Sequence, residues 1–104
     1  IYLGKAEEIL PYITGSYQLI LLDGPKGQYS AFASMLIPLL ETGGLLICDN
    51  VLFRGMVTGD RRIKSRKRTL VKKLDMFLRA LSADSSLMTS IVPIGDGISI
   101  SLKL

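Results

Sequence analysis

Residues 19–23 read Leu-Ile-Leu-Leu-Asp, and residues 45–50 read Leu-Leu-Ile-Cys-Asp-Asn. Each stretch is a short apolar run that ends in an acidic residue. Continuous apolar runs of this length are typical of strands that are buried on both faces, as in a parallel sheet covered by helices. The two stretches therefore predict two adjacent parallel strands and, with them, an α/β fold.

Polar side chains follow both predicted strands. Asp23 ends the first run, Asp49 and Asn50 end the second, and Lys26 follows Asp23 through a Gly-Pro turn. In open parallel sheets, ligands bind at the carboxyl ends of the strands. Carboxylate and amide oxygens suit a hard cation such as Mg²⁺, which keeps coordination positions for water or substrate. We therefore predict a metal site at this edge, with Lys26 reaching the same crevice.

Each of these residues also has a simpler explanation. An acid at the end of a strand can cap the helix that follows it. Lys26, taken alone, is typical of a solvated turn, and Tyr29, Phe32 and Phe77 are typical packing residues, although Tyr29 could also face the pocket. The metal-site hypothesis rests on the combination of Asp23 with the Asp-Asn pair.

The other segments predict helices packed on these strands and a terminal hairpin. Helical spacing of apolar residues is found over about 5–13 and 28–40, and again from residue 70 to residue 81. A strand, a helix and a strand in this order predict a right-handed parallel crossover. Residues 90–94 and 98–104 flank a Gly-Asp-Gly turn, which predicts an antiparallel hairpin. Residues 1–4 resemble the end of a further strand.

Composition limits the number of domains and the compartment. The chain has 104 residues, enough for one domain or part of one. Its single cysteine, Cys48, lies within an apolar run and is expected to pack as a small apolar residue in a reducing compartment. Signal-peptide features and apolar runs long enough to cross a bilayer are both missing from the sequence. We expect a cytoplasmic protein that does not bind membranes.

Positive charge is concentrated in one segment. The net charge is +4, and eight of the thirteen basic residues lie between Arg61 and Lys73. Such a cluster favours an RNA partner, because neutralisation of phosphates dominates RNA binding. A solvated helix face is the alternative. The predicted RNA-binding or substrate-binding residues are Arg54, Arg61, Arg62, Lys64, Arg66, Lys67 and Arg68.

Three blocks of sequence resemble the cation-dependent, S-adenosylmethionine-dependent O-methyltransferases of the catechol and caffeoyl-CoA type. The blocks are residues 19–29 (LILLDGPKGQY), residues 43–55 (GGLLICDNVLFRG) and residues 93–97 (PIGDG). Within the family they are most similar to the bacterial branch that methylates 5-hydroxyuridine in tRNA. The resemblance implies the Rossmann-like sheet of class I methyltransferases, with flanking helices and a terminal antiparallel hairpin.

The resemblance also implies roles for individual residues. Asp23, Asp49 and Asn50 match the metal ligands of the family, and Lys26 matches its catalytic base. Gly4, Lys5 and Ala6 fall where the family has a Gly-Asp-Ala turn beside the adenine of the cofactor, so these three residues and Asp23 are the expected cofactor contacts. The chain departs from the family pattern at Lys5, where an acid is usual, and at Pro25, where a residue of the cofactor pocket is usual.

In the family, a glycine-rich cofactor turn and an acid that binds the ribose precede the region matched here. The resemblance therefore implies that residues 1–104 are a single partial domain, the C-terminal half of a methyltransferase domain. We expect the chain alone to be inactive. The edge of the strand that ends at Asp23 would be unpaired, and unpaired edges recruit other chains, so a homodimer is expected.

The predicted function is O-methyl transfer from S-adenosylmethionine, assisted by a divalent cation, to 5-hydroxyuridine in tRNA, giving 5-methoxyuridine. One alternative is O-methylation of a small catechol-like phenol, and another is a non-catalytic RNA-binding module. Both 5-hydroxyuridine and a catechol offer two adjacent oxygens to one cation. The sequence does not distinguish these acceptors or identify the metal.

Overall fold

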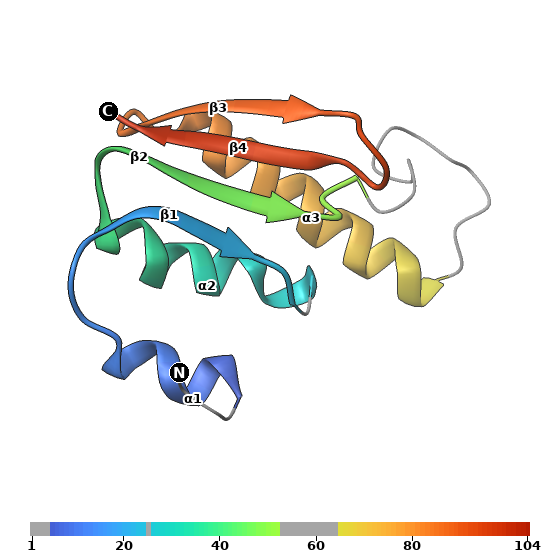
Figure 1. The fold of residues 1–104 in the computed structure, drawn as a ribbon. Coiled ribbons are helices and arrows are strands. Elements are labelled where there is room, and N and C mark those ends of the chain that lie inside the picture. Colours follow the sequence, from blue (N-terminus) through green and yellow to red (C-terminus); the bar gives the residue numbers. More distant parts are fainter. Residues whose placement is uncertain (1–4, 25, 53–64) are drawn as a thin grey trace.

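The computed structural model describes residues 5–24, 26–52 and 65–104, apart from the side chains of five of them, Glu7, Lys26, Ser65, Arg66 and Lys67 (Figure 1). The expected strand at residues 1–4 lies outside these ranges. The helices and strands, in chain order, are α1 (Ala6–Ile9), η1 (Leu10–Tyr12), β1 (Tyr17–Leu22), η2 (Lys26–Gln28), α2 (Tyr29–Leu36), η3 (Ile37–Leu39), β2 (Leu40–Asp49), α3 (Ser65–Ala83), β3 (Leu87–Val92) and β4 (Ile98–Lys103), where η marks a short 3₁₀ helix.

The described strands form a four-stranded sheet in the order β1-β2-β4-β3. β1 and β2 are parallel, whereas β4 is antiparallel to both β2 and β3. The predicted α/β fold, with parallel strands and a terminal antiparallel hairpin, is thus confirmed. Because β4 pairs with β2, the turn of the hairpin lies beside the carboxyl end of β2 (Figure 1).

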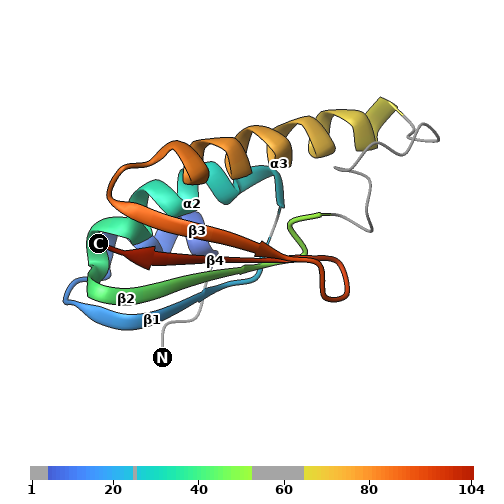
Figure 2. The ribbon, with the colours of Figure 1, turned by 90° about the horizontal axis from the view of Figure 1, so that it is seen from above.

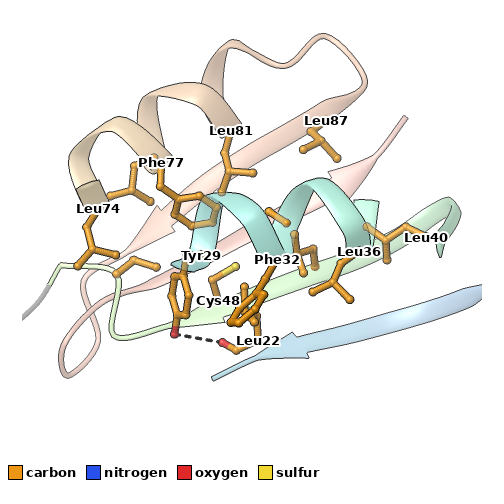
Figure 3. Packing of buried hydrophobic residues seen from close by; sticks show 14 residues of the cluster. Leu22, Tyr29, Phe32, Leu36, Leu40, Cys48, Leu74, Phe77, Leu81 and Leu87 are labelled. Atoms are coloured by element: carbon orange, nitrogen blue, oxygen red, sulfur yellow. Dashed lines mark hydrogen bonds between the residues drawn. The ribbon is translucent and has the colours of Figure 1, made fainter. Parts of the chain in front are cut away.

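The core lies between the sheet and the two longer helices, α2 and α3, which cover the same face (Figure 2). The largest fully buried side chains include Tyr29, Phe32, Leu46 and Leu74 (Figure 3). Leu74, Phe77, Leu78 and Leu81 of α3 are buried, as the helical spacing predicted. Cys48 is also fully buried, and burial raises the pKa of its thiol to about 11. Cys48 therefore packs as the small apolar residue that was predicted.

The opposite face of the sheet differs from the prediction. Both apolar runs were expected to be buried on both faces, but Leu19 is 55% exposed and Leu21 is 70% exposed. Leu45 and Ile47, their partners in the β1–β2 register, are only half-buried. The physical reason is that successive side chains of a strand point to opposite faces, and α2 and α3 cover only one of them (Figure 2).

The second strand also begins earlier than predicted. The apolar run predicted a strand from residue 45, but β2 begins at Leu40 and contains Gly43 and Gly44. Gly43 has a φ of +84°. A Cβ on Gly44 would lie 3.2 Å from the carbonyl oxygens of both Tyr17 and Gln18, so only glycine lets β2 come this close to the start of β1. The register between the two strands is irregular at the same place.

Candidate functional site

Asp23 and Asp49 lie at the same end of the sheet. The parallel register places Leu22 opposite Cys48, and the two acids are the next residues on the neighbouring strands. Both line one cavity of about 240 Å³, together with Leu21, Leu22, Ile47 and Ile98. Asp23 is exposed and Asp49 is half-buried. The structure thus brings together the two carboxylates that the sequence placed at one edge.

Asn50 follows Asp49 in a tight turn. Its φ is +56°, and among the described residues it is the only non-glycine residue with a positive φ. Asparagine adopts this conformation more readily than most residues, so the backbone alone is a sufficient reason for an asparagine here. Its main-chain N–H donates a hydrogen bond to Asp49 Oδ1 over 2.8 Å. This bond orients the Asp49 carboxylate.

The hairpin turn between β3 and β4 supports the loop that follows Asn50. The main-chain N–H of Val51 donates to the carbonyl oxygen of Gly97 over 3.1 Å, and that of Leu52 donates to Asp96 over 2.8 Å. Val51 is fully buried. The Gly-Asp-Gly segment is therefore a turn, as predicted, and it also anchors the chain immediately after the candidate ligands.

Gly97→Ala is expected to destabilise the chain more than Gly95→Ala. Both glycines have a positive φ, at +88° and +58°, so alanine costs about 1 to 2 kcal/mol at either position. At Gly97 a Cβ would in addition lie within 2.8 Å of Leu52 Cβ, whereas at Gly95 nothing lies within 4 Å. We expect this overlap to add about 1 to 3 kcal/mol. Urea unfolding of both variants measures the difference, and equal losses would contradict the close packing on Leu52.

The ligand chemistry fits a hard cation. Within residues 5–24, 26–52 and 65–104, no group of three or more His, Cys, Asp or Glu side chains that could hold a metal ion is found. The predicted set is of a different kind, with two carboxylates and one amide. Two carboxylates on one cavity provide charge and oxygen ligands, and Mg²⁺ in proteins commonly completes its shell with water and substrate oxygens. The ligand roles of Asp23, Asp49 and Asn50 remain predictions.

Several predicted site residues lie away from this cavity or outside the described part of the chain. Lys26 begins η2, immediately after the Asp23 turn, but its side chain is not among those described. Gly4 and Pro25 lie outside the described residues. Lys5 and Ala6 are exposed at the start of α1 and do not line the cavity. The base and cofactor roles therefore remain predictions.

The basic segment is described only from α3 onward. Arg54, Arg61, Arg62 and Lys64 lie outside the described residues, as do the side chains of Arg66 and Lys67, while Arg68 is exposed. A basic residue that was not among the predicted contacts lies beside the turn after Asp23. Lys73 Cδ and Nζ lie 3.7 and 3.8 Å from the position that a Cβ of Gly27 would occupy. Lys73 of α3 therefore brings positive charge next to η2.

Tyr29 is a second residue that was not assigned to the site. Its ring is fully buried, as expected for a packing residue. Its hydroxyl donates a hydrogen bond to the carbonyl oxygen of Asp49 over 2.9 Å. The sequence offered only a weak signal, an aromatic residue at the start of a predicted helix. The contact joins residues 20 positions apart and depends on how α2 packs on the strand ends.

Comparison with known proteins identifies the family. A family profile described as O-methyltransferase matches residues 5–104. The chain belongs to this O-methyltransferase family. A family member from Citrus natsudaidai, a caffeoyl-CoA O-methyltransferase, is 33% identical over 95 residues, which cover 86% of this chain and 40% of the relative. Caffeoyl-CoA O-methyltransferase 3 of Nicotiana tabacum is 35% identical over the same length and is covered to 38%.

Solved structures of similar proteins agree with this assignment. A methyltransferase from Podospora anserina, bound to S-adenosylhomocysteine, has a TM-score of 0.84 and 26% identity, covering 97% of this chain and 47% of that one. A candidate caffeoyl-CoA O-methyltransferase from Staphylococcus aureus has a TM-score of 0.86 and 33% identity, and the match covers 97% of this chain and 49% of that one. The chain thus spans about half the length of these family structures. The predicted class I methyltransferase fold is confirmed, and the tRNA branch stays a prediction.

Proposed function

We propose that this chain forms the metal-binding and acceptor-binding side of an S-adenosylmethionine-dependent O-methyltransferase. The observation that carries the proposal is the shared cavity of Asp23 and Asp49 at the carboxyl ends of two parallel strands. Membership of the O-methyltransferase family supports S-adenosylmethionine as the methyl donor. A similar solved structure, the methyltransferase from Podospora anserina, is bound to S-adenosylhomocysteine, which is the demethylated product of that donor.

In this proposal, Asp23 and Asp49 hold a divalent cation, with Asn50 as the third protein ligand. When bound, such a cation lowers the pKa of an acceptor hydroxyl and orients its oxygen. Lys26, which follows Asp23 in η2, would take the proton from that hydroxyl. The hydrogen bond from the Asn50 N–H holds one Asp49 oxygen in place before any acceptor arrives. An acceptor with two adjacent oxygens suits this arrangement.

We propose 5-hydroxyuridine in tRNA as the acceptor. The basic segment supports this choice, since eight of the thirteen basic residues lie between Arg61 and Lys73, and Lys73 of α3 lies beside Gly27 of η2. A tRNA substrate would place the protein in the cytoplasm. No helix among the described residues has the length and apolar character needed to span a membrane.

A catechol-like phenol is the second candidate acceptor. This candidate is favoured by the similarity of the chain to several caffeoyl-CoA O-methyltransferases, which are 33 to 35% identical to it. A caffeoyl group carries two adjacent hydroxyls and would use the same two carboxylates. The two candidates differ in the need for a basic surface, because tRNA has a phosphate backbone and a small phenol has none.

Methyl transfer can be tested in a chimera that joins residues 5–104 to the N-terminal half of the Staphylococcus aureus homologue. With Mg²⁺ and radiolabelled S-adenosylmethionine, label should enter either tRNA that contains 5-hydroxyuridine or a caffeoyl ester. The chain alone should give no transfer and no micromolar binding of S-adenosylmethionine in a calorimetric titration. Activity of the chain alone would contradict the proposal that methyl transfer also needs the N-terminal half of the enzyme.

The salt dependence of tRNA binding tests the basic segment. In the chimera, replacing Arg61, Arg62, Arg66 and Arg68 by Gln should weaken tRNA binding and reduce the logarithmic salt slope by about 3, since each phosphate contact contributes about 0.7 to 0.9. Arg79→Gln is the control, because Arg79 lies further along α3 and pairs with Asp75. Filter binding at several salt concentrations gives the slopes. An unchanged slope would favour the solvated helix face and the phenol acceptor.

We also propose that the chain alone self-associates through the exposed edge of β1. β1 is an end strand of the described sheet, and its Leu19 and Leu21 side chains are exposed on the open face next to that edge. An apolar hollow of about 340 Å³ borders the same edge and is lined in part by Ile13, Tyr17 and Leu36. An unpaired strand edge with apolar neighbours is a typical site for pairing with another chain.

A further inference from the structure

The feature that carries a further inference is the hydroxyl of Tyr29, which lies where the carboxyl ends of β1 and β2 meet (Figure 3). We propose that Tyr29 is a positioning residue. Its hydroxyl joins the ends of the two strands and so determines how Asp23 and Asp49 face their common cavity. The inference rests on the proposed function only in assigning a cation to that cavity.

The hydroxyl lies between one carbonyl group of the last ladder pair and one carbonyl group that follows it. The β1–β2 register ends with Leu22 opposite Cys48. Tyr29 Oη lies 2.9 Å from the carbonyl oxygen of Asp49 and 3.4 Å from that of Leu22. Its single hydrogen is donated to one carbonyl at a time, and the shorter distance marks Asp49 as the main acceptor. One carbonyl belongs to Asp49, and the other belongs to Leu22, which directly precedes Asp23.

Packing prevents the hydroxyl from turning to water. The Tyr29 ring is fully buried and makes an edge-to-face contact with Phe77, with ring centres 5.5 Å apart and planes at 65°. A buried hydroxyl is stable only when it is hydrogen-bonded. The packed ring therefore holds its oxygen at a fixed point between the strands, and the strand ends adjust to that point.

The consequence for Asp49 is restraint from two sides. Its carbonyl oxygen accepts from Tyr29, and its Oδ1 accepts from the N–H of Asn50 over 2.8 Å. Asp23 directly follows Leu22, whose carbonyl is the second acceptor of the same hydroxyl. If the tyrosine served only to fill the core, phenylalanine would serve equally well, and this difference makes the proposal testable.

The test compares Tyr29→Phe with Tyr17→Phe in the unmodified chain. Both changes remove one phenolic hydroxyl that donates to a carbonyl, since Tyr17 donates to Thr14 over 2.9 Å. Tyr17 is exposed and does not line the cavity of Asp23 and Asp49. Because Tyr17 lines the hollow of the proposed self-association, both variants are compared at a concentration at which the chain is monomeric, and Tyr17→Phe is then a matched control. Amide hydrogen exchange followed by NMR reports on the strand ends. Titration with Mn²⁺ as the probe reports on the cavity.

We expect Tyr29→Phe to speed exchange about fivefold at residues 22–23 and 49–50, as the loss of one hydrogen bond predicts, with little change in the middle of either strand. Binding of Mn²⁺ should weaken about tenfold, which is typical for loss of a group that orients a ligand. Tyr17→Phe should change neither quantity.

Two results would overturn the proposal. Exchange that is unchanged at the strand ends would show that the hydroxyl has no positioning role, and exchange that rises equally across the sheet would show a general loss of stability instead. Absence of Mn²⁺ binding by the unmodified chain would count against the metal site of the proposed function, and the exchange pattern would then decide on Tyr29 by itself.

Discussion

Asp49→Asn is expected to reduce cation-dependent methyl transfer by the chimera about 100-fold. The change removes a negative charge from a half-buried position on the cavity shared with Asp23. It keeps the size of the side chain and an oxygen that can accept from the N–H of Asn50, so the local fold should survive. Loss of residues that only orient metal ligands already costs about 10-fold to 100-fold, and loss of a charged ligand belongs at the upper end of that range.

Asp75→Asn is the control for this substitution. Asp75 lies on α3, is partly exposed and pairs with Arg79 over 3.0 Å, away from the cavity. Its replacement should leave the rate nearly unchanged. The rates are measured with Mg²⁺ and with excess chelator, because only the cation-dependent part is expected to fall. A rate that survives Asp49→Asn and still needs Mg²⁺ would place the metal elsewhere.

Leu46→Ala is expected to cost about 2 to 5 kcal/mol of unfolding free energy, and Leu21→Ala at most about 0.5 kcal/mol. Leu46 is fully buried between the sheet and its helices, whereas Leu21 is 70% exposed. Both residues lie in the apolar runs that the sequence presents as equivalent. Urea unfolding at a chain concentration low enough to keep it monomeric measures both values. A large loss at Leu21 would contradict the open face of the sheet.

The Leu21 position also tests self-association. A lysine at this position would place a charge in the proposed contact. Charged side chains on edge strands commonly prevent pairing with another chain. Sedimentation equilibrium of the chain alone should show a concentration-dependent dimer, and Leu21→Lys should shift it to monomer. A monomer at all concentrations before any substitution would remove the proposed homodimer.

Local patterns were sufficient to predict the elements and their order. Apolar runs ending in acids predicted β1 and β2, helical spacing predicted the buried face of α3, and the Gly-Asp-Gly turn predicted the β3–β4 hairpin. These predictions succeeded because each depends on residues that are close in sequence, where the periods of helix and strand are directly visible. The side-by-side placement of Asp23 and Asp49 followed from the same patterns, since parallel strands end at one edge.

The sequence by itself determined an α/β sheet with two acids at one edge and a family resemblance that the comparisons bear out. Only the tertiary structure decided which face of β1 stays open, where Tyr29 places its hydroxyl, and how Leu52 fills the space beside Gly97. The physical reason is that burial and hydrogen bonding between distant segments depend on how helices pack on the sheet. An apolar run has the same sequence signature whether a helix covers both of its faces or one.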